Sequence, residues 1–256
     1  MRFDTVPRAA SPARAILATV AVELRLALRR GENLLATIVI PAAVLLFFSS
    51  VAVIPVSTGR PIDFLLPGSI ALGIIATSLV SLGITTAYDR SYGVLKRLGG
   101  SPLTRGELVI ARVISVLVIE AVQVALLVAV AVGALHWEFG PGASPGLAIA
   151  AVILGTAAFA GLGLLLAGTL RAEAVLALAN VLFLGFLVAG GIVVPLDRLP
   201  SALAAVAGAL PAAPLAEALR IAFGGSPGAD IVTPFALLAG WAVVTFALAA
   251  RMFRWE

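Results

Sequence analysis

Long stretches without a charged side chain dominate this sequence. Between Glu32 and Arg60, and again between Glu138 and Arg171, no Asp, Glu, Lys or Arg interrupts the chain. An α-helix needs about 20 such residues to cross the roughly 30 Å apolar core of a bilayer. The stretches therefore predict membrane-spanning helices. The six predicted spans cover residues 34–54, 66–87, 108–135, 147–170, 174–194 and 232–250.

Composition excludes the other classes of protein. Of the 256 residues, 61% are hydrophobic and 12% are charged, whereas a soluble domain carries about 25% charged residues. Disorder would need low hydrophobicity and high charge, and the absence of cysteine excludes a disulfide framework and thiolate chemistry. We expect an all-α membrane protein, with residues 1–256 forming a single membrane domain.

The basic residues predict the orientation of the spans. With the N-terminus inside, only Arg60, Arg198 and Arg220 of the 17 basic residues lie outside, which follows the positive-inside rule. We predict a multi-pass protein of the bacterial inner or plasma membrane with both termini in the cytoplasm. The net charge of +4 then reflects topology. No nucleic-acid partner is expected, because no basic patch interleaved with aromatic residues is present.

Two segments outside the six spans have apolar patterns of their own. Residues 1–33 hold a helix that Ser11 and Pro12 can begin. Its moderately amphipathic pattern favours a helix lying flat at the cytoplasmic interface, and a cytoplasmic extension of the first span is the alternative. Residues 197–222 are broken by prolines. They predict either a broken hairpin that dips into the membrane from outside or an interfacial loop helix.

The loop at residues 88–105 predicts a short cytoplasmic helix over Gly93–Leu98. Val94, Leu95 and Leu98 share one face, beside Lys96 and Arg97. Gly99 and Gly100 end this helix, and Thr104 with Glu107 has the spacing of a capping box for the third span. The apolar face either docks on a partner or packs on the cytoplasmic ends of the same chain.

This loop resembles the coupling-helix region of type-2 ABC transporter permeases. The chain reads D-R-S-Y-G-V-L-K-R-L and then S-P-L-T-R-G-E-L, against a family pattern of E-R-E-x-G-T-L-K-R-L and T-P-L-S-R-x-E-L. Asp89, Ser91 and Val94 depart from that pattern. A second likeness runs from Asn180 through a Gly pair to P-L-D-R-L-P, and the likeness extends over nearly the whole chain.

The resemblance implies the permease subunit of an ATP-driven exporter. It also implies two partners: a cytosolic ABC ATPase, and a second permease copy or close paralogue. The chain has no G-x-x-x-x-G-K-[ST] loop, so we expect no enzyme activity and no cofactor in this chain, with ATP and Mg bound by the ATPase. The residues implied in ATPase coupling are Asp89, Arg90, Tyr92, Gly93, Val94, Leu95, Lys96, Arg97 and Leu98.

Short outer loops favour a small amphiphilic cargo, as in multidrug efflux, and a lipid-linked glycan or another cell-envelope lipid is the alternative. Candidates for the substrate pathway are Glu120, Gln123 and Asn180, which are polar residues at membrane depth. Glu120 and Gln123 could instead join helices, and Asn180 is expected to form a hydrogen bond between helices.

Two other classes of protein fit the sequence less well. An intramembrane enzyme would need clustered acids or histidines, and His136 stands alone beside Trp137, which is expected in the outer aromatic belt. A secondary transporter would need a repeat between the two halves of the chain, and none is visible.

Overall fold

The computed structural model describes residues 11–29, 31–51, 60–98, 104–225 and 228–252. This part of the chain is helical and holds no strand. Its elements are α1 (Pro12–Arg29), α2 (Gly31–Val51), α3 (Pro61–Ile74), the π-helical segment η1 (Ile75–Ser81), α4 (Leu82–Ser91), α5 (Val94–Leu98), α6 (Arg105–Leu135), α7 (Pro145–Thr169), α8 (Ala172–Ala189), the short 3-10 turn η2 (Leu196–Arg198), α9 (Ser201–Ala209), α10 (Ala212–Ala222) and α11 (Val232–Met252).

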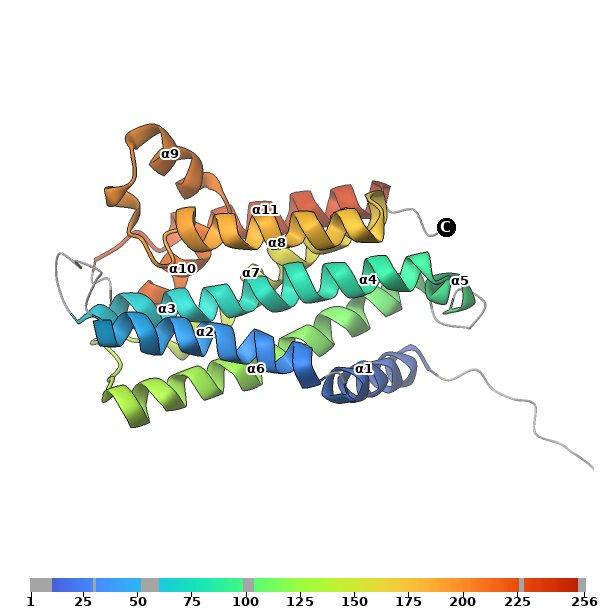
Figure 1. The fold of residues 1–256 in the computed structure, drawn as a ribbon, viewed down its shortest axis with the longest axis horizontal. Coiled ribbons are helices and arrows are strands. Elements are labelled where there is room, and N and C mark those ends of the chain that lie inside the picture. Colours follow the sequence, from blue (N-terminus) through green and yellow to red (C-terminus); the bar gives the residue numbers. More distant parts are fainter. Residues whose placement is uncertain (1–10, 30, 52–59, 99–103, 226–227, 253–256) are drawn as a thin grey trace, which may run out of the picture.

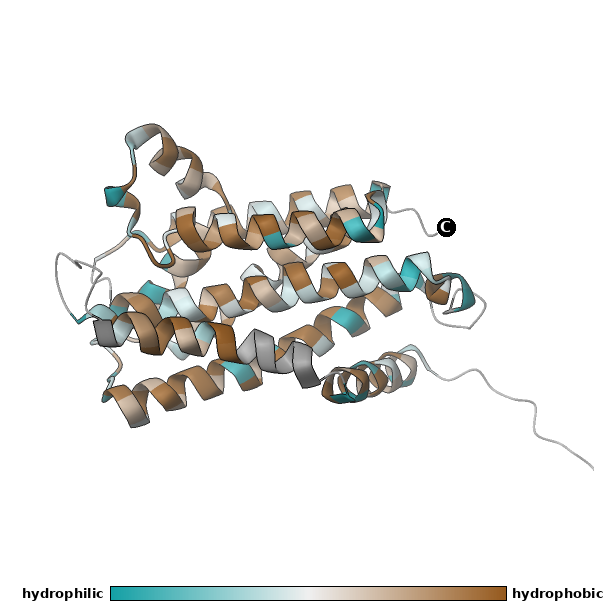
Figure 2. Ribbon diagram, viewed as in Figure 1, coloured by the Kyte–Doolittle hydropathy of each residue, from teal (hydrophilic) through white to brown (hydrophobic). Residues whose placement is uncertain are grey.

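Long apolar helices run side by side along the molecule (Figure 1). Five in the described part are long and apolar enough to cross a membrane, and one of these is the continuous α3–η1–α4 helix of 31 residues. Helix α2, with 21 residues, covers most of the first predicted span, and its crossing of the membrane stays a prediction. Figure 2 shows apolar residues along the helix bodies and polar ones mainly toward the ends. The predicted all-α membrane fold is confirmed.

Two helix boundaries show how local sequence sets the fold. Thr104 Oγ1 accepts from the Glu107 backbone N–H at 3.3 Å, and the Glu107 carboxylate accepts from the Thr104 N–H at 2.6 Å. The predicted capping box is thus confirmed. The fifth span was predicted to reach residue 194, but α8 ends at Ala189. Gly190 follows it, and Gly191 adopts a φ of +68°, a conformation that suits glycine and turns the chain away from the helix axis.

Helix α7 lies at the centre of the packing, against α11, α4, α10 and η1. Two glycines permit this close approach. A Cβ at Gly161 would lie 2.2 Å from the Thr245 hydroxyl of α11, and one at Gly163 would lie 2.9 Å from the carbonyl oxygens of Ser78 and Leu79 in η1. The small residues of the fourth span therefore serve helix packing, as in other membrane bundles.

The proline-rich segment forms a broken hairpin, as one of the two alternatives predicted. Helices α9 and α10 meet at an angle of 76°. Helix α10 is inserted among α3, α7 and α11, and its Leu215 and Leu219 are fully buried. Helix α9 stands away from the bundle (Figure 1), and its Val206 is 60% exposed.

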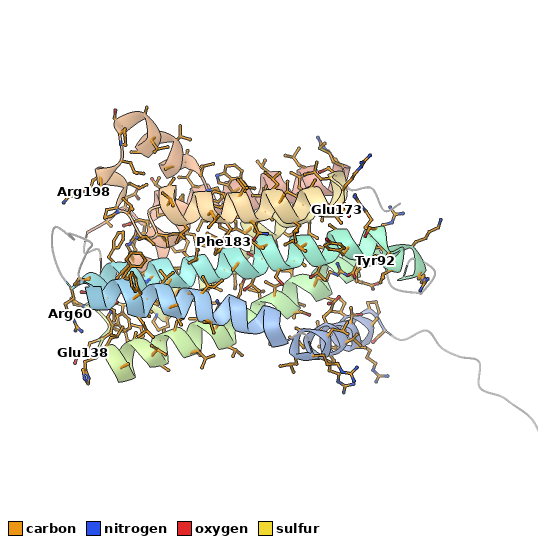
Figure 3. All side chains as sticks on the ribbon, in the orientation of Figure 1. Arg60, Tyr92, Glu138, Glu173, Phe183 and Arg198 are labelled. Atoms are coloured by element: carbon orange, nitrogen blue, oxygen red, sulfur yellow. The ribbon has the colours of Figure 1, made fainter. Side chains whose placement is uncertain are left out.

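The two ends of the bundle carry different elements. Helices α1 and α5 and the C-terminal end of α11 lie at one end, and α9 lies at the other (Figure 1). Arg60 and Arg198, which the sequence assigns to the outside, lie at the end opposite Tyr92 and Glu173 (Figure 3). The structure therefore places residues predicted to lie outside at one end of the bundle and residues predicted to lie in the cytoplasm at the other, as the predicted topology requires. Which end faces the cytoplasm stays a prediction.

Candidate functional site

The loop after the second span forms a tight turn and a short helix. Helix α4 continues to Ser91, and Gly93 adopts a φ of +70° with nothing within 4 Å of where a Cβ would lie. A side chain would have room at this position, so crowding does not explain the glycine. The positive φ does, because glycine adopts it without strain. The turn reverses the chain into α5, which presents Lys96 and Arg97 at the end of the bundle.

The apolar residues of this loop do not all face outward. Leu95 is 3% exposed and packs within its own chain, which is the alternative that the sequence left open for this residue. Tyr92, 70% exposed, forms the outer face together with Lys96 and Arg97. The Leu98 side chain and the predicted stop at residues 99–100 lie outside the described part of the chain. The coupling role of the loop stays a prediction.

Arg90 ties the loop to a different pair of spans. Its guanidinium donates a hydrogen bond to the backbone carbonyl of Leu170, the residue that ends α7. Near the same turn, the rings of Tyr88 and Tyr92 stack with their centroids 5.9 Å apart. A movement of α5 would therefore reach α4 through the turn and the α7–α8 junction through Arg90.

A buried arginine joins three helices close to the loop, on the side of the bundle interior. Arg112 of α6 is 4% exposed and donates hydrogen bonds to Asp89 and, at 2.7 Å, to the hydroxyl of Thr86 on α4. Its Nε lies 3.3 Å from Oε1 of Glu23 on α1. Of this network the sequence singled out only Asp89. The available signal was a charged residue about one turn inside the predicted span 108–135, which lipid would not tolerate without partners.

Two of the three polar residues predicted for the substrate pathway lie together in the middle of the bundle. Glu120 is fully buried and accepts a hydrogen bond from the Thr156 hydroxyl of α7. Gln123 is 2% exposed, and its Oε1 lies 3.5 Å from the Thr77 hydroxyl of η1. Both side chains therefore join α6 to neighbouring helices, which is the alternative that the sequence left open.

The π-helical segment η1 widens the span at the level of this polar cluster. A Cβ on Gly73, which precedes η1, would lie 2.3 Å from Gln123 Nε2. A larger residue at this position would therefore displace the Gln123 side chain from its place between α3 and α6. Segments of π-helix inside α-helices are frequent at functional sites. Here η1 turns Thr77 toward Gln123 while Thr77 also donates to the carbonyl of Gly73 at 2.9 Å.

Asn180, the third candidate, lies apart from the other two. It is exposed on α8, and its amide donates to the Leu176 carbonyl of the same helix at 2.7 Å. Among the described residues, Asn180 does not form the expected hydrogen bond to another helix. The surrounding face of α8 is apolar, with Val181 64% and Leu184 57% exposed.

At the opposite end of the bundle, Trp137 departs from its predicted place in the outer aromatic belt. It is 3% exposed, and its Nε1 donates to the Asp63 carboxylate at 3.0 Å. Its ring packs edge-on against Phe139 and Phe223. The indole is enclosed by the loop after α6 and the end of α10, so it anchors these segments within the protein.

Comparison with known proteins agrees with this architecture. The family model described as ABC-2 type transporter matches residues 14–223. The matched region runs from α1 to the end of α10, so it includes the loop, the Arg112 network and the buried polar cluster. A search among curated proteins found no matching sequence.

Proposed function

The chain belongs to the ABC-2 type transporter family, and on that premise we propose that it forms the translocation pathway of an ATP-driven exporter for small amphiphilic compounds. A separate cytosolic ABC ATPase binds ATP and Mg and supplies the energy. The proposed location is a bacterial inner or plasma membrane, with both termini in the cytoplasm. The chain itself is the membrane permease.

The observation that carries this proposal is the way α5 is held. The buried Leu95 anchors its inner side. Lys96 and Arg97 are exposed on its outer side, and Tyr92 is exposed in the turn before it. An anchored helix with an exposed basic and aromatic face can receive a partner and pass on its motion. A loop that only connected two spans would need neither the anchor nor the Arg90 contact with Leu170.

The contacts between α5 and the neighbouring helices supply a route by which a movement of α5 reaches the spans. Helix α4 is continuous with η1 and α3, so a displacement of α5 acts on the whole second span. The bonds from Arg112 to Asp89 and Glu23 extend it to α6 and α1. ATP-driven movement of the ATPase would rock these spans together and open the pathway alternately to the two sides.

A second permease copy or a close paralogue completes the proposed transporter. The exposed, mainly apolar face of α8 carries Asn180, which is itself exposed. A polar side chain on a membrane helix is stabilised when it meets a partner helix. We assign this face to the second permease.

Co-purification tests the ATPase contact. The permease would be co-expressed with a candidate ABC ATPase from the same genome, and the yield of complex would be compared among variants. We expect the double substitution Lys96→Glu and Arg97→Glu to lower the recovered ATPase at least tenfold, because it reverses the exposed charge of α5. A matched double variant, Arg171→Glu with Arg251→Glu, changes two exposed charges at the same end and should retain the complex. Equal recovery from both doubles would reject α5 as the docking element.

Cysteine cross-linking tests the proposed contact between α8 and the second permease. The chain has no native cysteine, so Asn180→Cys introduces a single thiol. We expect an oxidant to give a disulfide-linked permease dimer from Asn180→Cys. Val243→Cys, at a 70% exposed position of α11, serves as the control and should stay monomeric. A dimer from Val243→Cys alone would move the interface to α11.

A further inference from the structure

A cavity of about 430 Å³ lies between α1 and the bundle, at the end of the molecule that carries α5. Its walls come from α1, η1, α4 and α6, with Val94 of α5 at its edge. Pockets for drug-sized ligands measure about 300–1,000 Å³ and are mostly apolar, and this cavity fits that description. Its apolar lining includes Val22, Leu26, Leu82, Val116 and Ile119.

Three charged residues line the cavity: Glu23, Asp89 and Arg112. Arg112 contacts both carboxylates, so the group carries two negative charges and one positive charge when all three are ionised. The side chains of Glu23 and Asp89 are 24% and 21% exposed, whereas that of Arg112 is 5% exposed. The cavity therefore offers two partly exposed carboxylate side chains and an excess negative charge, whereas the guanidinium is nearly buried.

The deep part of the cavity approaches the buried polar cluster. Thr77 and Ser115 line it with hydroxyl groups, and Thr77 lies 3.5 Å from the Gln123 side chain. Ile119 is the residue before Glu120. The cavity thus extends from the charged residues Glu23, Asp89 and Arg112 to Thr77, which borders the buried polar cluster.

We propose that this cavity binds a cationic amphiphile, with its charged group at Glu23 and Asp89 and its apolar body between α1 and α6. Volume, apolar walls and charge all match this one class of ligand. Because α1 forms one wall, the ligand would enter from the membrane leaflet beside α1. The inference rests on the proposed function in naming the cargo class, but binding requires neither the ATPase nor transport.

The test measures binding to the purified permease in nanodiscs without the ATPase. The probes are a rhodamine ethyl ester, which is a lipophilic cation, and its free acid, which is zwitterionic at neutral pH. Fluorescence anisotropy should show saturable binding of the ester and at least tenfold weaker binding of the acid. Comparable affinities for both probes would overturn the proposal, and so would a preference for the acid, which would point to Arg112 as the recognition group.

Substitutions at the cavity test whether the probe binds there. Glu23→Gln should weaken binding of the ester about tenfold, whereas Glu173→Gln, which removes an exposed carboxylate at the same end, should leave the affinity unchanged. Leu26→Trp adds bulk to the cavity wall at a position that is 42% exposed, and it should also weaken binding. Leu17→Trp, at a 65% exposed position of α1 outside the cavity, is its control.

These outcomes separate the inference from the proposed function. If Glu23→Gln and Leu26→Trp both retain full affinity, any ester bound lies elsewhere, for example in the lipid, and the cavity proposal fails. The ATPase complex could still form in that case. Conversely, a permease that binds the ester at Glu23 but never recovers the ATPase would overturn the coupling proposal alone.

Discussion

The hydroxyl of Thr156 on α7 donates a hydrogen bond to the carboxylate of Glu120 on α6, and both residues are fully buried. This contact joins the third and fourth spans near the midpoint of α6. Oε1 of Glu120 is buried without a hydrogen-bond partner among the described residues. The Thr156 hydroxyl is thus the side-chain group that stabilises this carboxyl group in the interior.

We expect Thr156→Val to lower the free energy of unfolding by about 1–3 kcal/mol, the cost of leaving a buried polar group unsatisfied. Valine has nearly the same shape, so packing is preserved. Thr156→Ser keeps the hydroxyl and should lower the free energy of unfolding by less than Thr156→Val. Thermal unfolding in detergent measures the difference, and equal midpoints for the Val and Ser variants would show that the bond contributes nothing.

Arg112→Met should destabilise the protein by about 2 kcal/mol. Breaking a fully buried ion pair costs roughly 3–5 kcal/mol, and the cost is smaller here because Glu23 and Asp89 keep partial access to solvent. Arg25→Met removes an exposed arginine of α1 and should be nearly neutral. Denaturation of both variants in detergent checks this, and similar midpoints would mean that the network adds no stability.

Gly163→Ala should destabilise the bundle by about 1–3 kcal/mol, because overpacking forces neighbouring groups apart. The new Cβ would lie 2.9 Å from two carbonyl oxygens of η1, and backbone atoms cannot move aside as a flexible side chain can. Gly133→Ala in α6 meets nothing within 4 Å. It should be neutral or stabilise slightly, since alanine favours the helix. Equal effects at the two positions would contradict this account.

Asp230 should make the start of α11 sensitive to acid. Hydrogen bonds from the Thr233 hydroxyl and the Val232 N–H lower the pKa of its carboxyl group. A carboxyl whose pKa is depressed by folding stabilises the protein above its unfolded pKa, near 3.9, and loses this contribution as the pH falls through the folded pKa. We therefore expect Asp230→Asn to lower the unfolding midpoint at pH 7 and to have no effect near pH 2. A difference that persists at pH 2 would exclude this cause.

Cysteine labelling can decide the orientation of the bundle. Glu138 and Glu173 are exposed and lie at opposite ends (Figure 3), and the chain has no native cysteine. In intact cells a membrane-impermeant maleimide should label Glu138→Cys. Glu173→Cys should react only after the membrane is permeabilised. The reverse pattern would place the termini outside.

Much of the fold could be read from local sequence. Charge-free stretches predicted the spans, because a helix in lipid satisfies its own backbone groups and needs only apolar side chains of sufficient length. Thr104 with Glu107 predicted a helix start because both partners lie within one turn. The end of α8 was missed because its apolar run continues past Gly190 and Gly191, where only the backbone conformation changes.

The candidate site was predictable only in part. The loop at residues 88–98 stood out because its motif is continuous in the sequence. The roles of Glu23 and Arg112 were not visible, since their contacts join α1 to α6 across about 90 residues of chain. Val22 and Leu26 of α1 line the cavity, and nothing in their local sequence predicted that role.

The sequence by itself determined which segments are long and apolar enough to cross a membrane, which residues belong to opposite ends and which loop has the coupling pattern. These features depend on properties of neighbouring residues. The tertiary structure decided that Leu95 is an anchor, that Glu120 and Gln123 are buried between helices and that Asn180 faces outward. It also decided that a cavity with two carboxylates opens beside α1. Each of these depends on how distant helices pack, and packing is set by the shapes of both partners at once.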